Sequence, residues 1–172
     1  ACHTGFVLDF GVGKRRDAIP AILKEVLEVS AQDDEAALQA GVQRALAGGL
    51  ITREQHMGLN DLLELPQSAE QRMALEAMDN NMRVQRMGEA LIGILKRCAL
   101  QKPRLLVVED IHWASPDLLR YLALLTRMTS ESRIMLVMTS RFEGYPIDKG
   151  WRASTHGTSL ITVDLGPLSP DE

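Results

Sequence analysis

The apolar run at residues 105–108, which Glu109 and Asp110 follow directly, constrains the fold of this 172-residue chain more than any other feature. A strand that is apolar on both pleat faces is typical of the centre of a parallel sheet, with helices expected on each side. Ser115 and Pro116 then have the residue types of an N-cap and a first helical position, which predicts a helix to about Met128. We therefore expect an α/β fold.

Three further apolar segments predict strands, at residues 5–10, 134–139 and 160–165. The first is followed by a glycine-rich turn and by a helix for which Asp17 is the expected N-cap. Residues 145–158 show no clear period, and neither a helix nor a strand is predicted there. Strands that alternate with helices in this way predict a parallel sheet joined by helical crossovers.

Between the first two predicted strands, residues 31–103 form a large helical insertion. The helical period is interrupted at Gly48 and near Pro66, and two capping boxes mark new helix starts. The capping boxes pair a hydroxyl with an amide three residues later: Thr52 with Gln55, and Ser68 with Gln71.

Methionines recur along the second half of this region, alternating with Leu75 and Val84 at helical spacing. Such flexible side chains serve either a core or an adaptable partner groove. The spacing favours the core for all four, which are Met73, Met78, Met82 and Met87.

Charge and cysteine content restrict the class of function. The chain has 19 Lys and Arg against 23 Asp and Glu, a net charge of -4, which argues against a general nucleic-acid binder. Cys2 and Cys98 are too few for a disulfide framework or a zinc site, and they fit a reducing compartment, so we expect a cytoplasmic protein. No apolar run approaches the ~20 residues that span a bilayer.

The sequence GVGK follows a predicted strand and precedes a helix, which is the context of a phosphate-binding loop. A Walker A loop ending there would need glycine and a hydroxyl residue where Leu8 and Arg15 stand, and a dinucleotide fingerprint would need glycine at Arg16. Both templates fail. We interpret the segment as a strand-to-helix turn in which Gly11 and Gly13 supply permissive backbone angles.

The carboxylates of Glu109 and Asp110 carry the strongest chemical signal. Ligands of open α/β sheets bind at the carboxyl ends of the strands, where paired acids can hold a hydrated Mg²⁺ and position a water. Acids at this position also serve as helix caps and surface charge. Residue type and placement alone leave both interpretations open.

Residues 105–119, LLVVEDIHWASPDLL, resemble the Walker B segment of the STAND class of P-loop ATPases, an AAA+-like group. The resemblance is closest to modules attached to class III adenylate or guanylate cyclase domains in bacterial signalling proteins. The pattern comprises four apolar residues and a set of five positions: Glu109, Asp110, His112, Trp113 and Pro116.

Other segments resemble further parts of this module. Residues 135–144, MLVMTSRFEG, resemble its sensor strand, and residues 160–172 resemble its last core strand and the entry to a lid domain. The implied division is a second strand and helix at 1–30, a helical region at 31–103, the Walker B strand, helix, sensor strand and last strand at 104–166, and the start of the lid at 167–172.

The resemblance implies roles for three residues. Glu109 would hold Mg²⁺, through water, and Asp110 would polarise the attacking water. Arg141 would be the sensor that contacts the γ-phosphate, an ordinary use of arginine in phosphoryl transfer. ATP and Mg²⁺ are the implied cofactors of the intact protein, whereas His112 and Trp113 are expected to pack beneath the acidic loop.

The departure from the family is the missing first strand and Walker A loop, which supplies the phosphate-binding donors. We expect both to precede Ala1 in a longer protein, and we expect this chain alone to be inactive and to hold no nucleotide tightly. The missing strand would lie between the strands at 134–139 and 160–165. Because unpaired strand edges attract other chains, we also expect self-association.

The leading hypothesis is a fragment of a signal-transduction ATPase that regulates an output domain such as a nucleotide cyclase. The alternative is a non-catalytic interaction module, in which residues 33–101 bind a partner and the acids are vestigial. A phosphoacceptor receiver domain would also place acids and Thr139 at strand ends. The absence of lysine from residues 160–167 ranks that interpretation last.

Overall fold

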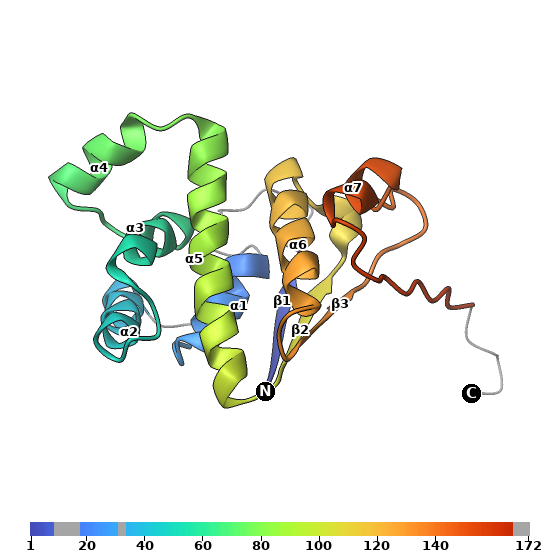
Figure 1. The fold of residues 1–172 in the computed structure, drawn as a ribbon, viewed down its shortest axis with the longest axis horizontal. Helices are drawn as coiled ribbons and strands as arrows, with labels where there is room; N and C mark the ends of the chain where they lie inside the picture. Colours follow the sequence, from blue (N-terminus) through green and yellow to red (C-terminus); the bar gives the residue numbers. More distant parts are fainter. Residues whose placement is uncertain (9–17, 31–33, 167–172) are drawn as a thin grey trace.

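The structure is a computed structural model that describes residues 1–8, 18–30 and 34–166 (Figure 1). It is a mixed α/β fold in which helices predominate around a small sheet. The strands are β1 (Cys2–Phe6), β2 (Arg104–Glu109) and β3 (Ile134–Met138), and the helices are α1 (Ala18–Val26), α2 (Glu35–Ala47), α3 (Arg53–Leu62), α4 (Ala69–Glu76), α5 (Asn80–Gln101), α6 (Pro116–Thr129) and α7 (Lys149–Ser154).

The three strands are parallel and lie in the order β1-β2-β3, which confirms the predicted parallel sheet. Cys2 pairs with Leu105, and Arg104 pairs with Ile134. The predicted strand at residues 134–139 is therefore confirmed within one residue. The first strand begins at Cys2 rather than at Gly5, and residues 9–17, which include the glycine turn and Asp17, lie outside the described residues.

Both connections of the sheet lie on one face. The chain moves from β1 to β2 and from β2 to β3 in the same direction, and right-handed crossovers then place both sets of helices on the same side. Leu106 and Val108 of β2 are fully buried on that side. Leu105 and Val107, which alternate with them, are only half-buried. The expectation of helices on both sides of β2 is wrong for the part of the chain that the structure describes.

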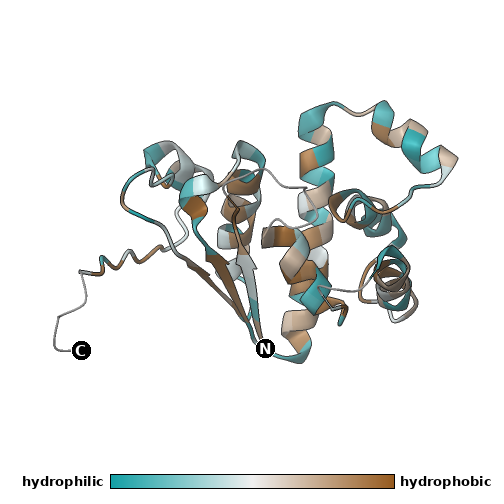
Figure 2. Ribbon diagram, turned by 180° about the vertical axis from the view of Figure 1, so that it is seen from behind, coloured by the Kyte–Doolittle hydropathy of each residue, from teal (hydrophilic) through white to brown (hydrophobic). Residues whose placement is uncertain are grey.

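We call the other side of the sheet the open face. Figure 2 shows the strands from the side opposite α6, with no described helix in front of them. Phe6 is 52% and Met135 is 64% exposed on this face. By alternation along each strand it comprises Cys2, Thr4, Phe6, Leu105, Val107, Glu109, Met135 and Val137.

The core lies between the helical face of the sheet and the helices α1, α5 and α6. At Gly5, α1 crosses β1 so closely that a Cβ atom would lie 2.5 Å from the main-chain oxygen of Ala18. On the far side of α5, α3 packs along its length. The predicted apolar stripe of α5 is buried at Leu91, Ile94, Leu95 and Cys98.

Both predicted capping boxes are present. The side chains of Thr52 and Ser68 accept hydrogen bonds from the main-chain N–H of Gln55 and Gln71, and each glutamine side chain accepts one from the main-chain N–H of its cap residue. Arg97 of α5 also donates to Gln55 Oε1 at 2.7 Å, which ties α3 to α5.

The methionine prediction is wrong at three of the four positions. Met73 of α4 is 71% exposed and Met82 of α5 is 53% exposed. Met78 is half-buried but lies outside the core, whereas Met87 packs against it. The physical reason is a break that the helical spacing did not predict: α4 ends at Glu76 and α5 starts from a separate cap at Asp79. Leu75 is the residue that α4 buries, and most of its other side chains are exposed.

Two corrections concern the C-terminal third. The predicted last strand at residues 160–165 pairs with no strand, because no described strand lies beside it to accept its main-chain bonds. Conversely, residues 145–158 contain α7, which Asp148 caps through a bond from the Trp151 N–H and which buries Trp151. None of the described helices is long and apolar enough to cross a membrane.

Candidate functional site at the carboxyl edge of the sheet

The loops that follow β2 and β3 are joined by main-chain hydrogen bonds. The Asp110 N–H donates to Thr139 Oγ1 at 3.2 Å, and the Ile111 N–H donates to the Thr139 carbonyl oxygen at 2.9 Å. The Thr139 N–H in turn donates to the Val108 carbonyl oxygen at 3.0 Å. Parallel pairing of β2 with β3 therefore continues past the strand ends and fixes the acids against the loop that follows β3.

The two acids occupy different positions at this edge. Glu109 is the last residue of β2, pairs with Phe6 across the sheet and is half-buried at the open face. Asp110 turns the chain with a left-handed φ of 61°, a conformation that aspartate tolerates better than most residues. Its side chain is 53% exposed. Both carboxylates are thus accessible to a ligand at the carboxyl ends of β2 and β3.

His112 lies beneath this loop, as expected. Its side chain is 8% exposed, and its ring stands edge-on to Trp113 with the ring centroids 5.0 Å apart. Nδ1 accepts a hydrogen bond from the Arg141 main-chain N–H at 3.4 Å and lies 3.8 Å from Asp110 Oδ1. Nε2 is buried with no hydrogen-bond partner in the described part of the chain. His112 therefore packs between the acidic loop and the loop after β3.

Arg141 follows β3 by three residues and is exposed. Its main chain is bonded to His112, and its guanidinium makes no ion pair with another described residue. The structure thus places Glu109, Asp110 and Arg141 at one edge of the sheet, at the carboxyl ends of two neighbouring strands. The sequence marks Thr139 only as a strand-end residue, and its bond to the acidic loop carries no sequence signal.

The carboxylates of Glu109 and Asp110 suit a metal ion that keeps part of its water shell. Among the described residues no group of three His, Cys, Asp or Glu could hold a metal ion. Two adjacent carboxylates at a strand end do not form a protein cage, but Mg²⁺ commonly keeps several waters and binds one or two carboxylates together with substrate phosphates. Glu109 and Asp110 fit that mode of binding.

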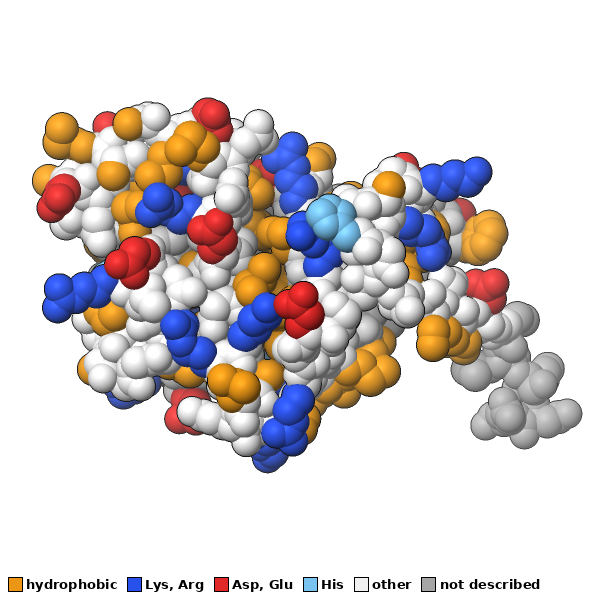
Figure 3. Space-filling view, in the orientation of Figure 1, with side chains coloured by type: hydrophobic (Ala, Val, Ile, Leu, Met, Phe, Trp, Pro, Cys, Tyr) orange, Lys and Arg blue, Asp and Glu red, His pale blue; other side chains and the backbone are white. Residues whose placement is uncertain are grey.

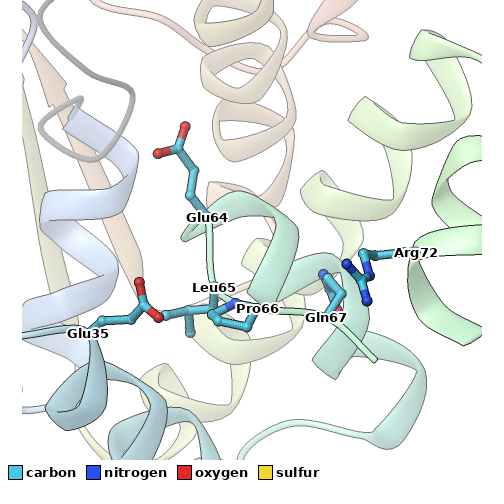
Figure 4. Close-up of a pocket in the computed structure, with 6 residues that line it drawn as sticks. All are labelled: Glu35, Glu64, Leu65, Pro66, Gln67 and Arg72. Carbon is cyan, nitrogen blue, oxygen red and sulfur yellow. The ribbon is translucent and has the colours of Figure 1, made fainter. Parts of the chain in front are cut away.

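Two hollows lie away from these acids. One of about 450 Å³ lies between the start of α2 and the α3–α4 connection, and Figure 4 shows its lining residues: Glu35, Glu64, Leu65, Pro66, Gln67 and Arg72. The other, of about 460 Å³, lies among α1, α3, α5 and α6. Neither is lined by Glu109, Asp110 or Arg141, although the second includes Ser115, which caps α6 directly after the acidic loop.

The second hollow contains an ion pair that sequence reasoning missed. Arg83 of α5 donates to both oxygens of Asp61, the shorter bond being 2.7 Å, and this contact raises the pKa of Arg83. Burial raises the pKa of the nearby Tyr121 to about 12, and its hydroxyl donates to the Met87 sulfur. The pair links residues 22 apart on different helices, a spacing that no local sequence pattern predicts.

The surface charge is mixed. Figure 3 shows acidic and basic side chains interspersed over the face in view. This distribution accords with the net charge of -4.

Comparisons with protein-family models, with curated proteins and with solved structures found no match. The chemistry of the acidic edge is therefore inferred from its own residues and from the Walker B resemblance of residues 105–119.

Proposed function

We propose that this chain is part of a STAND-class P-loop ATPase module that binds and hydrolyses Mg-ATP to regulate an attached output domain, such as a nucleotide cyclase, in the bacterial cytoplasm. The observation that supports it is the position of Glu109 and Asp110 at the carboxyl end of the middle strand. Open α/β sheets bind their ligands at that edge. The loop that carries Arg141 is bonded directly to the acidic loop.

In this proposal each residue has one task. Glu109 holds Mg²⁺ through water, and Asp110 orients the water that attacks the γ-phosphate. Mg²⁺ held there would neutralise charge on the phosphate oxygens. Arg141 would contact the γ-phosphate from the next strand, and its exposure and lack of an ion-pair partner among the described residues support this role.

The phosphate-binding half of the site would come from a strand, a Walker A loop and a helix that precede Ala1. β1, β2 and β3 follow one another across the sheet in one direction. A preceding strand that paired with the outer edge of β3 would have to connect back across the sheet to β1, in the opposite direction. A right-handed connection in that direction would place its helix on the open face. In one such unit, the strand would therefore pair with the outer edge of β3 and the helix would cover the open face. In this proposal a lid domain would begin after residue 166.

The test is calorimetric titration of Mg-ATP into this chain and into a chain extended by such a unit, on the order of 30 residues. We expect binding by the extended chain only. In the extended chain, Asp110→Asn should leave binding within about tenfold but lower kcat by roughly 10²-fold or more, since it removes the group that orients water.

Asp117→Asn is the matched control for Asp110→Asn. The Asp117 side chain is 51% exposed, close to the 53% of Asp110, and it lies in the first turn of α6. It should leave both binding and turnover unchanged. Equal losses of activity in the two variants would contradict the role of Asp110.

The second candidate is a non-catalytic interaction module, and the exposure of the α4 region favours it. Met73 and Met82 present flexible apolar side chains to solvent, a property of adaptable partner surfaces. If the extended chain bound no Mg-ATP, this interpretation would take first place. A partner at this region would then lower hydrogen exchange in α4 without any change at Glu109 and Asp110.

A further inference from the structure

The loop that carries Arg141 has a single polar anchor. We call residues 140–145 the β3 loop, and residues 141–145 are all exposed. The Arg141 N–H donates to His112 Nδ1 at 3.4 Å. Within the described chain, this is the one hydrogen bond that ties the β3 loop to another segment, because the Ser140 hydroxyl and the Tyr145 N–H donate to carbonyl oxygens of the loop itself. The position of Arg141 therefore depends on His112.

His112 is held firmly on its own side of this contact. It lies in the short 3-10 turn η2 (Ile111–Trp113), in which Ile111 is buried. Its side chain is 8% exposed, and its ring stands edge-on to Trp113. Gly144, with a φ of 79°, lies over it so closely that a Cβ atom there would be 3.7 Å from His112 Cβ. His112 is therefore a fixed point against which both ends of the β3 loop rest.

The hydrogen bond defines the protonation of the ring. Because Nδ1 accepts from the Arg141 N–H, the neutral ring carries its proton on Nε2. Nε2 is buried with no hydrogen-bond partner among the described residues. An unpaired buried N–H destabilises a fold, and an apolar ring would fill the space without that cost. Such costs concentrate at functional sites. The acceptor at Nδ1, rather than the packing of the ring, is thus the feature that calls for histidine.

The same nitrogen also lies near the acidic loop. His112 Nδ1 is 3.8 Å from Asp110 Oδ1, which is beyond hydrogen-bond distance. One atom of the ring therefore separates the Arg141 main chain from the Asp110 carboxylate. These are the two residues that the proposed function places on either side of the attacked phosphate, and the ring sets the spacing between them.

We propose that His112 is a positioning residue for phosphoryl transfer, an inference that rests on the proposed function. Its Nδ1 holds the Arg141 main chain beside the acidic loop, so that the Arg141 guanidinium and the water oriented by Asp110 meet the same γ-phosphate. In this role His112 contacts neither nucleotide nor metal, and it acts through Arg141. A displacement of about 1 Å at a catalytic group can cost on the order of 10²-fold in rate. A long hydrogen bond with little effect on stability can thus have a large effect on turnover.

The first test uses this chain and two matched variants. His112→Asn keeps a polar atom at the place of Nδ1, whereas His112→Gln carries the same amide one bond further from the main chain. We expect the Arg141 amide, followed by NMR, to exchange with solvent about tenfold faster or more in His112→Gln. It should exchange as in the unaltered chain in His112→Asn and in the control His156→Gln. Equal rates in all four proteins would overturn the proposal.

The second test reads the ring directly. At about pH 8, where an ordinary imidazole is neutral, the ¹⁵N shifts of His112 should show a bare Nδ1 and a protonated Nε2. A proton on Nδ1 would overturn the proposal, because that atom could then not accept from the Arg141 N–H. Neither of these two measurements involves a nucleotide, so their outcome is independent of ATP binding.

The third test is a double-mutant cycle in the extended chain. His112→Gln should lower kcat by roughly 10- to 100-fold and leave the KM for Mg-ATP within about threefold. His112→Asn should restore kcat. Combined with Arg141→Ala, His112→Gln should cause no further loss, since it acts through the side chain already removed.

The cycle separates this role from the proposed function. Losses that multiply in the double variant would overturn the role of His112 alone, because the ring would then act on something other than Arg141. An extended chain that does not hydrolyse Mg-ATP would overturn the proposed function, and the positioning role with it.

Discussion

At the scale of single residues, His3 is an unusual buried group in the sheet. It is 5% exposed, and its ring joins two charged side chains. Arg104 Nη1 lies 3.0 Å from Nε2, and Glu25 Oε2 lies 3.2 Å from Nδ1. The neutral ring with its proton on Nδ1 satisfies both contacts, because it accepts from the guanidinium and donates to the carboxylate.

This arrangement predicts a pH-dependent stability. Burial lowers the pKa of His3 below 6.5; the hydrogen bond with Glu25 opposes this shift, and the nearby Arg104 charge adds to it. The unfolded chain therefore binds more protons than the folded one as the pH falls below about 6.5, and stability is lost in that range. We expect the urea midpoint to fall between about pH 7.5 and pH 5.5.

His3→Gln should reduce that fall, since glutamine can accept from Arg104 and donate to Glu25 without titrating. Burial also lowers the pKa of His56, so protonation of His56 likewise destabilises the fold as the pH falls. Part of the pH dependence of the urea midpoint should therefore remain in His3→Gln. His156→Gln, at an exposed position, is the control and should leave the slope unchanged. An unaltered slope in His3→Gln would contradict this assignment.

Much of the residue-level detail of the candidate site could be predicted from sequence. The positions of Glu109, Asp110 and Arg141 follow from where two apolar strands end. The bond from the Asp110 N–H to Thr139 could not be predicted, because it depends on the register between β2 and β3. The packing of His112 beneath the acidic loop is the structural interpretation of this residue, but its contact with the Arg141 main chain could not be predicted.

At the scale of elements, the two capping boxes stand in contrasting surroundings. α3, capped by Thr52, packs along α5 and is tied to it through Gln55 and Arg97. α4, capped by Ser68, buries Leu75 alone. The same local motif therefore begins one helix that belongs to the core and one that lies mostly in solvent.

We predict different consequences for the loss of each cap. Thr52→Ala should lower the free energy of unfolding by about 1 kcal/mol, the usual cost of a lost N-cap. Ser68→Ala should leave the urea midpoint nearly unchanged and speed hydrogen exchange of the α4 amides alone, because α4 can open without the rest. A global loss of similar size in both variants would show that α4 unfolds with the core.

Helix starts that are set by residues within one turn can be predicted from the sequence. Strands, which form only beside another strand, cannot be predicted with the same success. The caps at Thr52, Ser68 and Ser115 depend on residues within one turn, and all three are present. Residues 160–165 have the pattern of a strand but no described strand beside them. α7 was missed because six residues are too few to show a helical period, although Asp148 is a recognisable cap.

At the scale of the whole molecule, the order of strands explains what sequence could not predict. The apolar run at 105–108 indicates burial on both faces, but which faces are covered depends on the direction of the crossovers. Both run the same way here, so Leu105 and Val107 remain half-buried. The helical insertion also separates strands that pair, since Cys2 and Leu105 are neighbours in the sheet.

This separation predicts an order of folding. Pairing of β1 with β2 joins residues 103 apart in sequence, Cys2 and Leu105, whereas pairing of β3 with β2 joins residues 30 apart, Arg104 and Ile134. Loop-closure entropy makes the first closure costlier by about 1 kcal/mol, which favours early formation of β2, α6 and β3. Leu125→Ala in α6 should therefore slow folding. Val7→Ala, beside β1, should mainly speed unfolding.

Both side chains are buried, at 1% and 6% exposure, so each variant should change stability enough for its kinetic effect to be measured. Chevron plots in urea would give the two rates. A Val7→Ala variant that slowed folding as much as Leu125→Ala would contradict late docking of β1.

The position of Ala1 sets the geometry of anything joined to the N-terminus. Its main-chain nitrogen donates to the Pro103 carbonyl oxygen at 2.8 Å, beside the start of β2. Glu109 ends the same strand, and six residues of strand span about 20 Å. A domain fused at Ala1 would thus begin one full strand length from the acids. A helix that connected a loop beside the acids to Ala1 would therefore have to run the length of that strand.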